Sequence, residues 1–359
     1  MKKIEQFFKW SLLNLLLFIN PKIRSTGNEN FSCESKILFI RLNRIGDALI
    51  TTPLLDLVKK EFNCSIYILA DRKNYFIFEN NPSIDEVIIF DKSINGIFGI
   101  NKIIKSRKID TVVDLHDDVS TTVSFIIAIA KVRNKFGLKK SNSKIFTKTV
   151  ERINSSKHHI IERTLRLSSL FNLPVNKNYV SIHYYPKMES IKYADSEIEK
   201  RIRKNKFLLG INLFTGSEAR FWGVDNFKKL IEQVRKYEIS YILFSTQDKL
   251  EIAKNITEEK FIYPPSKEFD TFAAGISKLN FLFTPDTSVV HIASIYKIPV
   301  FGLYVKYNTQ DIIWSPYNTE FDCIVTEEPT LKNVSFEEVI NKFIPFLERN
   351  INVQRNSFL

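Results

Sequence analysis

Cysteine is scarce in this sequence of 359 residues. Cys33, Cys64 and Cys323 are far apart, odd in number and part of no CxxC motif or Cys/His cluster. A disulfide framework needs paired cysteines, and a structural zinc site needs clustered ligands. The sequence therefore argues against both and favours a reducing compartment.

Glycine and long apolar runs are also scarce. None of the ten glycines belongs to a GxxxxGK[ST] motif, which excludes a Walker A loop. Within residues 1–25, the apolar stretch WSLLNLLLFI spans ten residues and contains Asn14, whereas a transmembrane helix needs about 20. Basic residues surround this stretch, and no small-x-small cleavage site follows it. We expect residues 1–30 to form an amphipathic segment that either lies on an anionic membrane surface or packs on the protein itself.

The composition is that of a folded chain with excess positive charge. Hydrophobic residues make up 44% of the chain and charged residues 26%, which argues against wholesale disorder. The formal net charge of +12 favours anionic partners, such as phosphate groups, nucleic acid or an acidic lipid surface. Nucleic acid is the least supported, because no RNP-type motif, zinc finger or helix-turn-helix signature is present.

Two series of short apolar runs alternate with helical patterns, which predicts an α/β fold with parallel sheets. In the first series we expect strands at 36–42, 65–70, 86–90 and 111–115, and helices at 47–61, 94–105 and 119–131. In the second series we expect strands at 207–214, 240–245, 260–264, 280–286 and 298–304, and helices at 225–237, 248–259, 268–277, 287–296 and 335–350. The polar and basic stretch at about 139–206 is predicted to connect the two series and to contain one helix, at 158–173.

These patterns predict two doubly wound, Rossmann-like domains facing an interdomain cleft. The length agrees, since single cores stop growing at roughly 250 residues. The expected boundaries are 31–175 for the first domain, 176–206 for a linker, 207–335 for the second domain and 336–359 for a C-terminal helix. Ligands of such sheets bind beyond the carboxyl ends of the strands, so functional residues should lie just after strands.

The first such place is the stretch RLNRIGDALITTP at 41–53. Gly46 would let the chain turn tightly, and Asp47 falls at or beside the N-cap of the next helix. One interpretation is that Asp47 only caps the helix. The other is that Asp47 is a general base within reach of a substrate hydroxyl.

Two further stretches follow strands of the second series. Thr215, Ser217 and Arg220 lie in a small polar loop that would suit a diphosphate. Asp286 ends a strand, Thr287 and Ser288 would present hydroxyls and amides at a helix start, and His291 lies four residues after Thr287. The alternatives are a surface arginine in the first stretch and a plain capped helix with a satisfied histidine in the second.

Residues 116–118, His-Asp-Asp, follow another expected strand and raise the question of a metal site. Neighbouring residues in an extended segment point in different directions, and no other His or carboxylate cluster lies nearby in the sequence. We therefore predict no metal site.

Taken together, three stretches make the chain resemble glycosyltransferase family 9, the ADP-heptose:lipopolysaccharide heptosyltransferases. They are ILFIRLNRIGDALITTPLLDLVKK, the segment around ARFWGVDNFKKL, and PDTSVVHIASIYKIPVFGLY, and they cover about residues 36–305 in the family's order. The resemblance implies a GT-B fold and an inverting transfer without metal or other cofactor. It assigns the general base to Asp47, the donor diphosphate to Arg220, Thr287 and Ser288, and a supporting role to His291.

The chain departs from the family's pattern at three positions. Arg220 stands where the family usually has Lys, Gly223 where it usually has Pro, and Ser288 where it usually has Gly. A backbone angle that required Gly at Ser288 would have to be strained or altered. These departures leave the identity of the donor's sugar and nucleotide undecided. Asp248 and Glu251 are candidates for holding the donor's ribose.

The expected partners are a nucleotide-sugar donor, with ADP-heptose favoured, and a lipid-linked glycan acceptor. The enzyme would be cytoplasmic and peripheral at the cytoplasmic face of the inner membrane, with residues 1–30 near an anionic surface. The alternatives are a transferase that uses another nucleotide sugar for O-antigen or capsule, and a non-catalytic nucleotide-sugar-binding protein.

Overall fold

The computed structural model describes residues 30–42, 44–202, 206–213 and 216–357. The expected amphipathic segment at 1–30 therefore lies outside the described residues, except for residue 30 itself. Within the described ranges, no helix combines the length and apolar character needed to cross a bilayer. Contacts divide the chain into two compact units, with the division between His183 and Tyr184.

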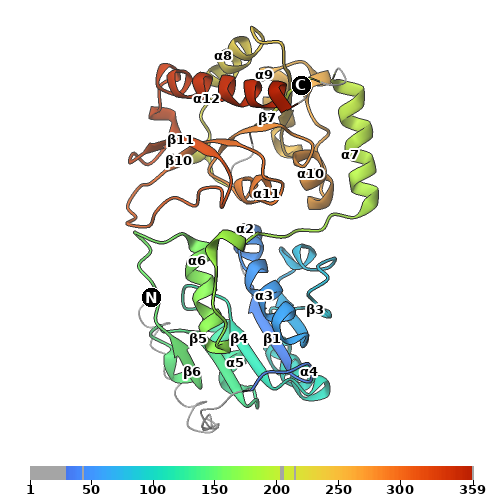
Figure 1. The fold of residues 1–359 in the computed structure, drawn as a ribbon, viewed down its shortest axis with the longest axis vertical. Coiled ribbons are helices and arrows are strands. Elements are labelled where there is room, and N and C mark those ends of the chain that lie inside the picture. The colour runs from blue at the N-terminus through green and yellow to red at the C-terminus, as the bar shows by residue number, and fades with distance from the viewer. Residues whose placement is uncertain (1–29, 43, 203–205, 214–215, 358–359) are drawn as a thin grey trace. The chain divides into compact units, whose positions relative to one another are not determined.

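The first unit is a six-stranded parallel sheet in the order β3-β2-β1-β4-β5-β6 (Figure 1). Its strands are β1 (Lys36–Arg41), β2 (Ser65–Ala70), β3 (Glu86–Ile89), β4 (Thr111–Asp114), β5 (Asn134–Leu138) and β6 (Lys148–Val150). Its α-helices are α2 (Ile45–Leu49), α3 (Thr52–Phe62), α4 (Ile94–Arg107), α5 (Thr121–Ile129) and α6 (Ile160–Leu165). Short 3₁₀ turns complete the unit, among them η1 (Tyr75–Ile77) and η3 (Arg166–Phe171).

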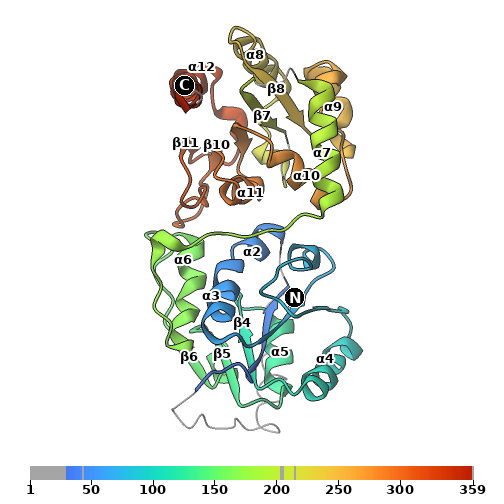
Figure 2. The same ribbon diagram turned by 45° about the vertical axis from the view of Figure 1, so that its right-hand side comes forward.

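Both faces of this sheet are covered, which explains why β1 is apolar along most of its length. Leu38 and Ile40 belong to a core shared with residues of α4 and α5, such as Ile104 and Val123. Phe39 points to the other face, where its ring lies 6.2 Å from that of Phe171 in η3. Strands buried on both faces read as continuous apolar runs, as expected for a parallel sheet between helical layers (Figure 2).

The second unit is a five-stranded parallel sheet in the order β11-β10-β9-β7-β8. Its strands are β7 (Leu208–Asn212), β8 (Ser240–Phe244), β9 (Phe281–Pro285), β10 (Val300–Val305) and β11 (Phe321–Thr326). Its α-helices are α7 (Met188–Arg201), α8 (Val224–Val234), α9 (Leu250–Ile256), α10 (Phe269–Ile276), α11 (Val289–Ile295) and α12 (Phe336–Ser357). The 3₁₀ turns η5 (Glu218–Arg220), η6 (Gln247–Lys249) and η7 (Glu259–Phe261) lie between them.

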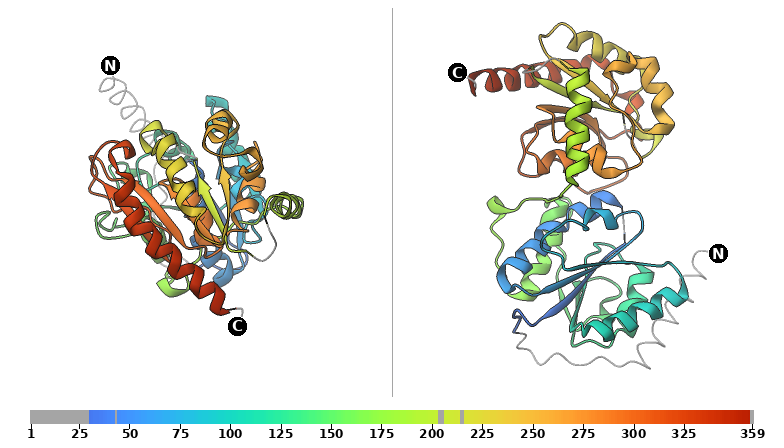
Figure 3. Two further views of the ribbon diagram at one scale, coloured as in Figure 1. Left: turned by 90° about the horizontal axis from the view of Figure 1, so that it is seen from above. Right: turned by 90° about the vertical axis from the view of Figure 1, so that its right-hand side faces the viewer.

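Aromatic side chains form much of the second core. Phe343 of α12 contacts Phe281, Phe283 and Phe301, with ring centroids 5.2 to 6.0 Å apart. The long helix α12 lies along one side of the sheet (Figure 3). Trp222 is 1% exposed, and its indole N–H donates to the Val334 carbonyl at 2.9 Å.

The structure differs from the sequence-based prediction in several elements. The strand expected at 260–264 is wrong: η7 ends at Phe261, and a single bridge joins Ile262 to Leu243. The helix expected at 158–173 is confirmed in part by α6 and η3. The rest of the stretch 139–206 is not a plain connection, because it also contains strand β6 and helix α7. Strands β5, β6 and β11 were not expected. Their polar or short sequences lack the long β-branched runs that mark a buried strand.

The division between the two units falls within the expected linker. On each side of it, the chain is hydrogen-bonded to its own unit. The His183 amide donates to the Thr52 hydroxyl at 2.9 Å in the first unit. The Tyr184 hydroxyl donates to Asp270 in the second, and the Lys187 amide donates to the same carboxylate at 3.1 Å. Helix α7 follows and packs on α10 in the second unit.

Gly223 has φ +108° and ψ 149° at the N-cap of α8, a region that glycine alone adopts readily. Proline fixes φ near −65°, so this backbone could not accept the Pro that the resembled family usually has here. We predict that Gly223→Ala lowers the free energy of unfolding by about 1–3 kcal/mol, although there is room for a Cβ, which would come no nearer than 4.0 Å to the Asn226 side chain.

The matched control is Gly99→Ala, which also has open space but lies inside α4 without a positive φ. Alanine should stabilise that helix by about 0.5–1 kcal/mol. Urea unfolding followed by circular dichroism compares the two variants. Equal effects at the two positions would contradict a backbone constraint at Gly223.

Candidate functional site

In the first unit, a buried guanidinium organises the carboxyl end of the sheet. Arg41 is the last residue of β1 and is 1% exposed. Its Nη2 donates to Asp47 Oδ1 at 2.7 Å, its Nε to the Asp47 carbonyl at 3.0 Å, and its Nη1 to the Leu115 carbonyl at 2.5 Å. One side chain therefore joins the ends of β1 and β4 to the first turn of α2.

Asp47 occupies the expected helix start, but it is not the cap. The N-cap of α2 is Arg44, and no side chain caps the helix there. Asp47 lies in the first helical turn, and its carboxylate is oriented by Arg41. Gly46 is buried inside α2 with no positive φ, so the prediction that it permits a tight turn is wrong.

Oδ1 of Asp47 is committed to Arg41, whereas Oδ2 accepts no protein hydrogen bond within the described part of the chain. The side chain is 16% exposed. The carboxylate is thus held in one orientation and keeps one oxygen for another molecule. A preorganised acceptor with partial solvent access is what a general base requires.

Behind this pair lies a second buried cluster. Lys140 Nζ donates at 2.8 Å to Asp114 Oδ2 and to the His116 carbonyl, and His116 Nδ1 lies 2.7 Å from Asp114 Oδ1. Burial alone would raise the pKa of Asp114, but the His116 hydrogen bond and the Lys140 charge outweigh it and lower the pKa to about 2.

The contacts of His116 define its protonation state. The Leu42 amide donates to His116 Nε2 at 3.1 Å, so Nε2 must be an acceptor and the proton lies on Nδ1, facing Asp114. His116 is therefore neutral, and burial lowers its pKa below the ordinary 6.5. The ring fixes Leu42, the residue that follows β1.

The two aspartates of the His-Asp-Asp stretch lie near arginine side chains. Asp117 pairs with Arg163 and, at 3.0 Å, with Arg152. Asp118 is 94% exposed. His116 thus pairs with Asp114, whereas Asp117 and Asp118 both face Arg152, at 3.0 and 3.9 Å. Within the described ranges, no group of His, Cys, Asp or Glu side chains has the arrangement of a metal site.

In the second unit, an arginine and an aspartate meet at the carboxyl end of the sheet. Arg220 of η5 places Nη2 3.1 Å from Oδ2 of Asp286, which follows β9. Burial raises the pKa of Asp286, and the charge of Arg220 opposes that rise. The Arg220 side chain is 37% exposed, and its guanidinium has further N–H donors for an anion.

Thr287 and Ser288 directly precede α11 and follow Asp286 of this ion pair. The Val289 amide donates to the Thr287 hydroxyl at 3.2 Å, and Ser288 is the N-cap with φ −59°. This angle suits any residue, so the strain considered for a serine in the family's glycine position does not occur. His291 is buried on the same helix, with its ring 6.2 Å from that of Trp314.

The remaining expected residues are less tightly grouped. Thr215 lies outside the described residues. Ser217 is exposed and shares a turn with Arg220, whose amide donates to its carbonyl at 3.1 Å. Asp248 and Glu251 are exposed, and a hydrogen bond with Thr246 lowers the pKa of Asp248. Neither acidic residue is placed beside Arg220 by a contact.

Sequence reasoning missed Arg41, Lys140 and the bonded role of His116. One signal was present: the charged residue Arg41 directly follows the buried apolar run Ile37–Ile40 within β1. Buried charges are paired or functional, so the sequence already implied that this arginine has a charged or polar partner. Lys140 gave no such signal, because it lies in a basic loop whose folding back onto β4 is a tertiary contact.

Comparisons with known proteins agree with one another. The profile of glycosyltransferase family 9 (heptosyltransferase) matches residues 97–344. The lipopolysaccharide core heptosyltransferase OpsX of Haemophilus influenzae is 22% identical over 292 residues, which are 79% of this chain and 82% of that protein.

Two solved structures are similar in fold. The family 9 glycosyl transferase from Veillonella parvula superposes with a TM-score of 0.75 at 20% identity, covering 89% of this chain and 98% of that one. The E. coli heptosyltransferase WaaC with ADP has a TM-score of 0.68 at 16% identity, covering 88% of this chain and 99% of that one. The two Rossmann-like units are those of a GT-B fold, as expected.

The neutral state of His116 predicts how stability depends on pH. In the unfolded chain the imidazole binds a proton below about pH 6.5, whereas the folded protein resists that proton because the pKa is lowered. The unfolded state then holds more protons, so His116 makes the free energy of unfolding fall as pH drops below about 6.5, by at most about 1.4 kcal/mol per pH unit.

His116→Gln keeps an acceptor for the Leu42 amide but cannot be protonated. We expect a smaller loss of stability between pH 7 and pH 5 in this variant than in the wild type, measured by urea unfolding with circular dichroism. Identical slopes for the two proteins would contradict the neutral assignment.

Proposed function

The chain belongs to glycosyltransferase family 9, and from that premise we propose that it transfers heptose, or a similar sugar, from ADP-heptose to the lipopolysaccharide core or a related surface glycan. Family membership makes the protein a glycosyltransferase of the heptosyltransferase type. The donor, the acceptor, inversion at the anomeric carbon and the base are the proposal. The solved WaaC structure contains ADP, which supports an adenine nucleotide as the donor's carrier.

The orientation of Asp47 carries this proposal. An acceptor hydroxyl is a poor nucleophile until its proton is removed, and Asp47 Oδ2 is the oxygen available for that proton. As the proton moves to Asp47, the acceptor oxygen bonds to the anomeric carbon. The bond from that carbon to the diphosphate oxygen breaks, and its electron pair leaves with ADP. A single displacement of this kind inverts the anomeric centre.

The second unit supplies the groups for the leaving diphosphate. Negative charge grows on the departing oxygen, and a fixed cation and amide donors stabilise it. Arg220 would provide the cation, and Thr287 and Ser288 would provide hydroxyls at the start of α11. The protein's own positive charge thus takes the role that a divalent metal has in other transferases, and we propose a metal-independent reaction.

The cellular setting belongs to the same proposal. A lipid-linked acceptor would hold the enzyme at the cytoplasmic face of the inner membrane, and the net charge of +12 favours an anionic surface there. A second donor also has support. Arg220 and Gly223 differ from the usual residues of the family at the donor loop, which favours considering another nucleotide sugar, for O-antigen or capsule.

Asp47→Asn tests the base and the donor together. Asparagine is nearly isosteric but cannot take up the proton, so we expect transfer from ADP-heptose to a truncated lipopolysaccharide core to fall by about 10²–10⁴-fold. Donor binding should survive, because the proposed donor residues lie in the second unit. Nucleotide binding is measured as the thermal shift caused by ADP, UDP or GDP. Of the three, only ADP should stabilise the wild type and the Asp47→Asn variant.

The control is Asp118→Asn, which removes a carboxylate of the same unit that is 94% exposed. Its transfer rate should equal that of the wild type. A fully active Asp47→Asn protein would remove Asp47 from its role. Stabilisation of the wild type by UDP or GDP but not by ADP would overturn the proposed donor.

A further inference from the structure

Lys140 is a buried lysine in the loop between β5 and β6, and its side chain is 1% exposed. Its Nζ donates at 2.8 Å to Asp114 Oδ2 and to the His116 carbonyl, and at 3.2 Å to the Asp118 carbonyl. An ammonium group has three N–H donors, so each donor of Lys140 has a protein acceptor. The charge of Lys140 therefore acts on protein groups and not on a ligand.

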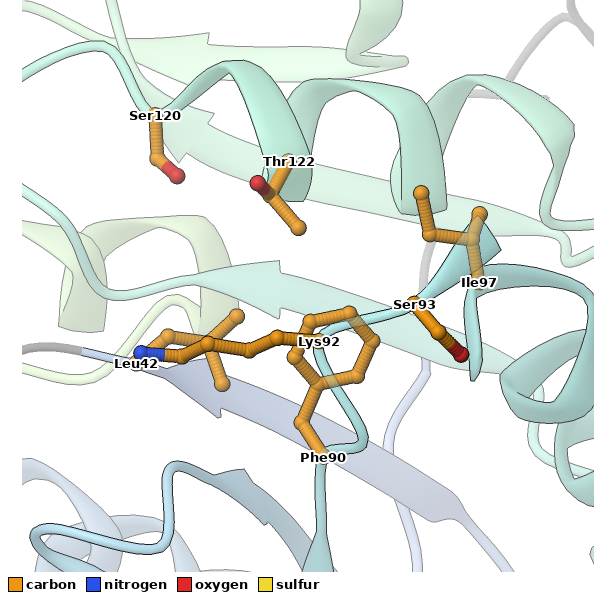
Figure 4. Close-up of a pocket in the computed structure, with 7 residues that line it drawn as sticks. All are labelled: Leu42, Phe90, Lys92, Ser93, Ile97, Ser120 and Thr122. Carbon is orange, nitrogen blue, oxygen red and sulfur yellow. The ribbon is translucent and has the colours of Figure 1, made fainter. Parts of the chain in front are cut away.

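Lys92 is the opposite case in the same unit. It follows β3, its side chain is 63% exposed, and it lines a pocket of about 370 Å³ together with Leu42, Phe90 and Thr122 (Figure 4). A ligand in that pocket can reach the Lys92 ammonium. Because the Lys140 side chain is almost completely buried, the effect of its charge must be sought among its protein neighbours.

The loop that carries Lys140 is held in place by side-chain hydrogen bonds. The Lys140 amide donates to the Ser143 hydroxyl at 2.9 Å, and that hydroxyl donates to the Lys140 carbonyl at 2.6 Å. The Asn142 side-chain amide donates to the Ser124 hydroxyl of α5 at 2.8 Å. These bonds fix the start of the Lys140 side chain, so its ammonium is a constant partner of Asp114.

Two carboxylates act on the Arg41 guanidinium. Asp47 accepts from its Nη2 at 2.7 Å, whereas Asp114 acts through its charge. Asp114 belongs to the neighbouring strand, where it pairs in register with Ile40, the residue before Arg41. Arg41 also donates from Nη1 to the carbonyl of Leu115, the residue after Asp114. The guanidinium is thus bonded both to Asp47 and to the segment that carries Asp114.

Lys140 balances the charge of Asp114. His116 is neutral, so its ring N–H and its backbone amide give Asp114 hydrogen bonds but no positive charge. The Asp114 side chain is 1% exposed, and a buried carboxylate needs a cation or must take up a proton. With Lys140 removed, Arg41 is a cation that is already bonded to this strand end. Asp114 would then compete with Asp47 for the same guanidinium.

We propose that Lys140 is a positioning residue for sugar transfer, because it neutralises Asp114 and so keeps the Arg41 guanidinium available for Asp47. The link to transfer rests on the proposed function, in which Asp47 is the base. Without Lys140, Arg41 would move towards Asp114, and the Asp47 carboxylate would lose the donor that orients it. Asp47 Oδ2 would then face the acceptor hydroxyl in fewer molecules, and transfer would slow while substrate binding stayed the same.

Lys140→Met tests the proposal, because methionine is unbranched and of similar length but carries no charge. We expect kcat for transfer from ADP-heptose to fall about tenfold, with the KM of each substrate changed less than about twofold. The matched control is Lys139→Met, which removes the adjacent lysine, whose side chain is 59% exposed and pairs with exposed Glu151. That variant should keep the wild-type kcat. An unchanged kcat in Lys140→Met would overturn the proposal.

A second substitution separates lost orientation from lost folding. Adding Asp114→Asn to Lys140→Met removes the competing carboxylate, and the new amide oxygen can still accept from His116. We expect this double variant to recover kcat to within about threefold of the wild type, although it lacks both members of the buried ion pair. Circular dichroism and thermal unfolding show whether each variant is folded. A folded double variant with no recovery of kcat would contradict the competition between Asp114 and Asp47.

The pH dependence gives a readout that a loss of stability would not mimic. Arg41 and Lys140 place positive charge beside the Asp114–His116 pair. Without Lys140 the pair takes up a proton more readily as pH falls, and the protonated pair no longer attracts Arg41. The kcat of Lys140→Met relative to the wild type should therefore rise as the pH is lowered from about 8 to about 6. A constant or falling ratio would contradict the proposal.

Crystal structures test the orientation of Asp47 without catalysis. In Lys140→Met at about pH 8, Arg41 Nη2 should lie beyond hydrogen-bonding distance of Asp47 Oδ1, and in the double variant the contact should return to the 2.7 Å of the wild type. An intact contact in Lys140→Met would overturn the positioning role. A wild-type protein that makes no product from ADP-heptose would instead contradict the proposed function, and the crystal structures would still decide whether Lys140 positions Asp47.

Discussion

The hydrogen bonds of the Arg41 guanidinium are the interaction on which the first unit's site depends. Burial lowers the pKa of this arginine, and the charges of Asp47 and Asp114 oppose that effect. A charge removed from water in this way costs several kcal/mol, of the order of 3–5, when its partner is lost. The guanidinium therefore stays paired, and its fixed fork determines where Asp47 points. Capping alone would not have oriented the carboxylate, because Asp47 is not the N-cap.

The two units contain the same kind of ion pair, but the arginines differ in how far they are buried. In each, a buried or half-buried carboxylate meets an arginine beyond the carboxyl ends of parallel strands: Asp47 with Arg41 in one and Asp286 with Arg220 in the other. The first arginine is buried and orients the carboxylate. The second is 37% exposed and keeps donors for an anion. In the proposed function, the buried arginine would position the base and the exposed arginine would bind the donor diphosphate.

Much of the fold could be predicted from the sequence, because apolar runs such as KILFI and SIYILA encode buried parallel strands directly. The polar strand at Asn134–Leu138 and the edge strand at Phe321–Thr326 could not, since pairing with neighbours rather than local pattern makes them strands. The family resemblance was confirmed by the match over residues 97–344. For the site, the sequence named Asp47, Arg220 and Asp286, and the charge at the end of β1 was a signal for Arg41. The pairing of Arg41 with Asp47 and of Arg220 with Asp286 follows from the folded structure and could not be predicted.

The central claim is that Arg41 acts on transfer through Asp47, and a double-mutant cycle tests it most directly. Lysine keeps the charge of Arg41 but loses the fork that holds two oxygens of Asp47. Transfer rates of the wild type, Arg41→Lys, Asp47→Asn and the double variant would be measured at saturating donor, with folding checked by circular dichroism. We expect Arg41→Lys to lower the rate at least tenfold in the wild type and to change it little once Asp47 is Asn. An equal loss in both backgrounds would contradict the claim.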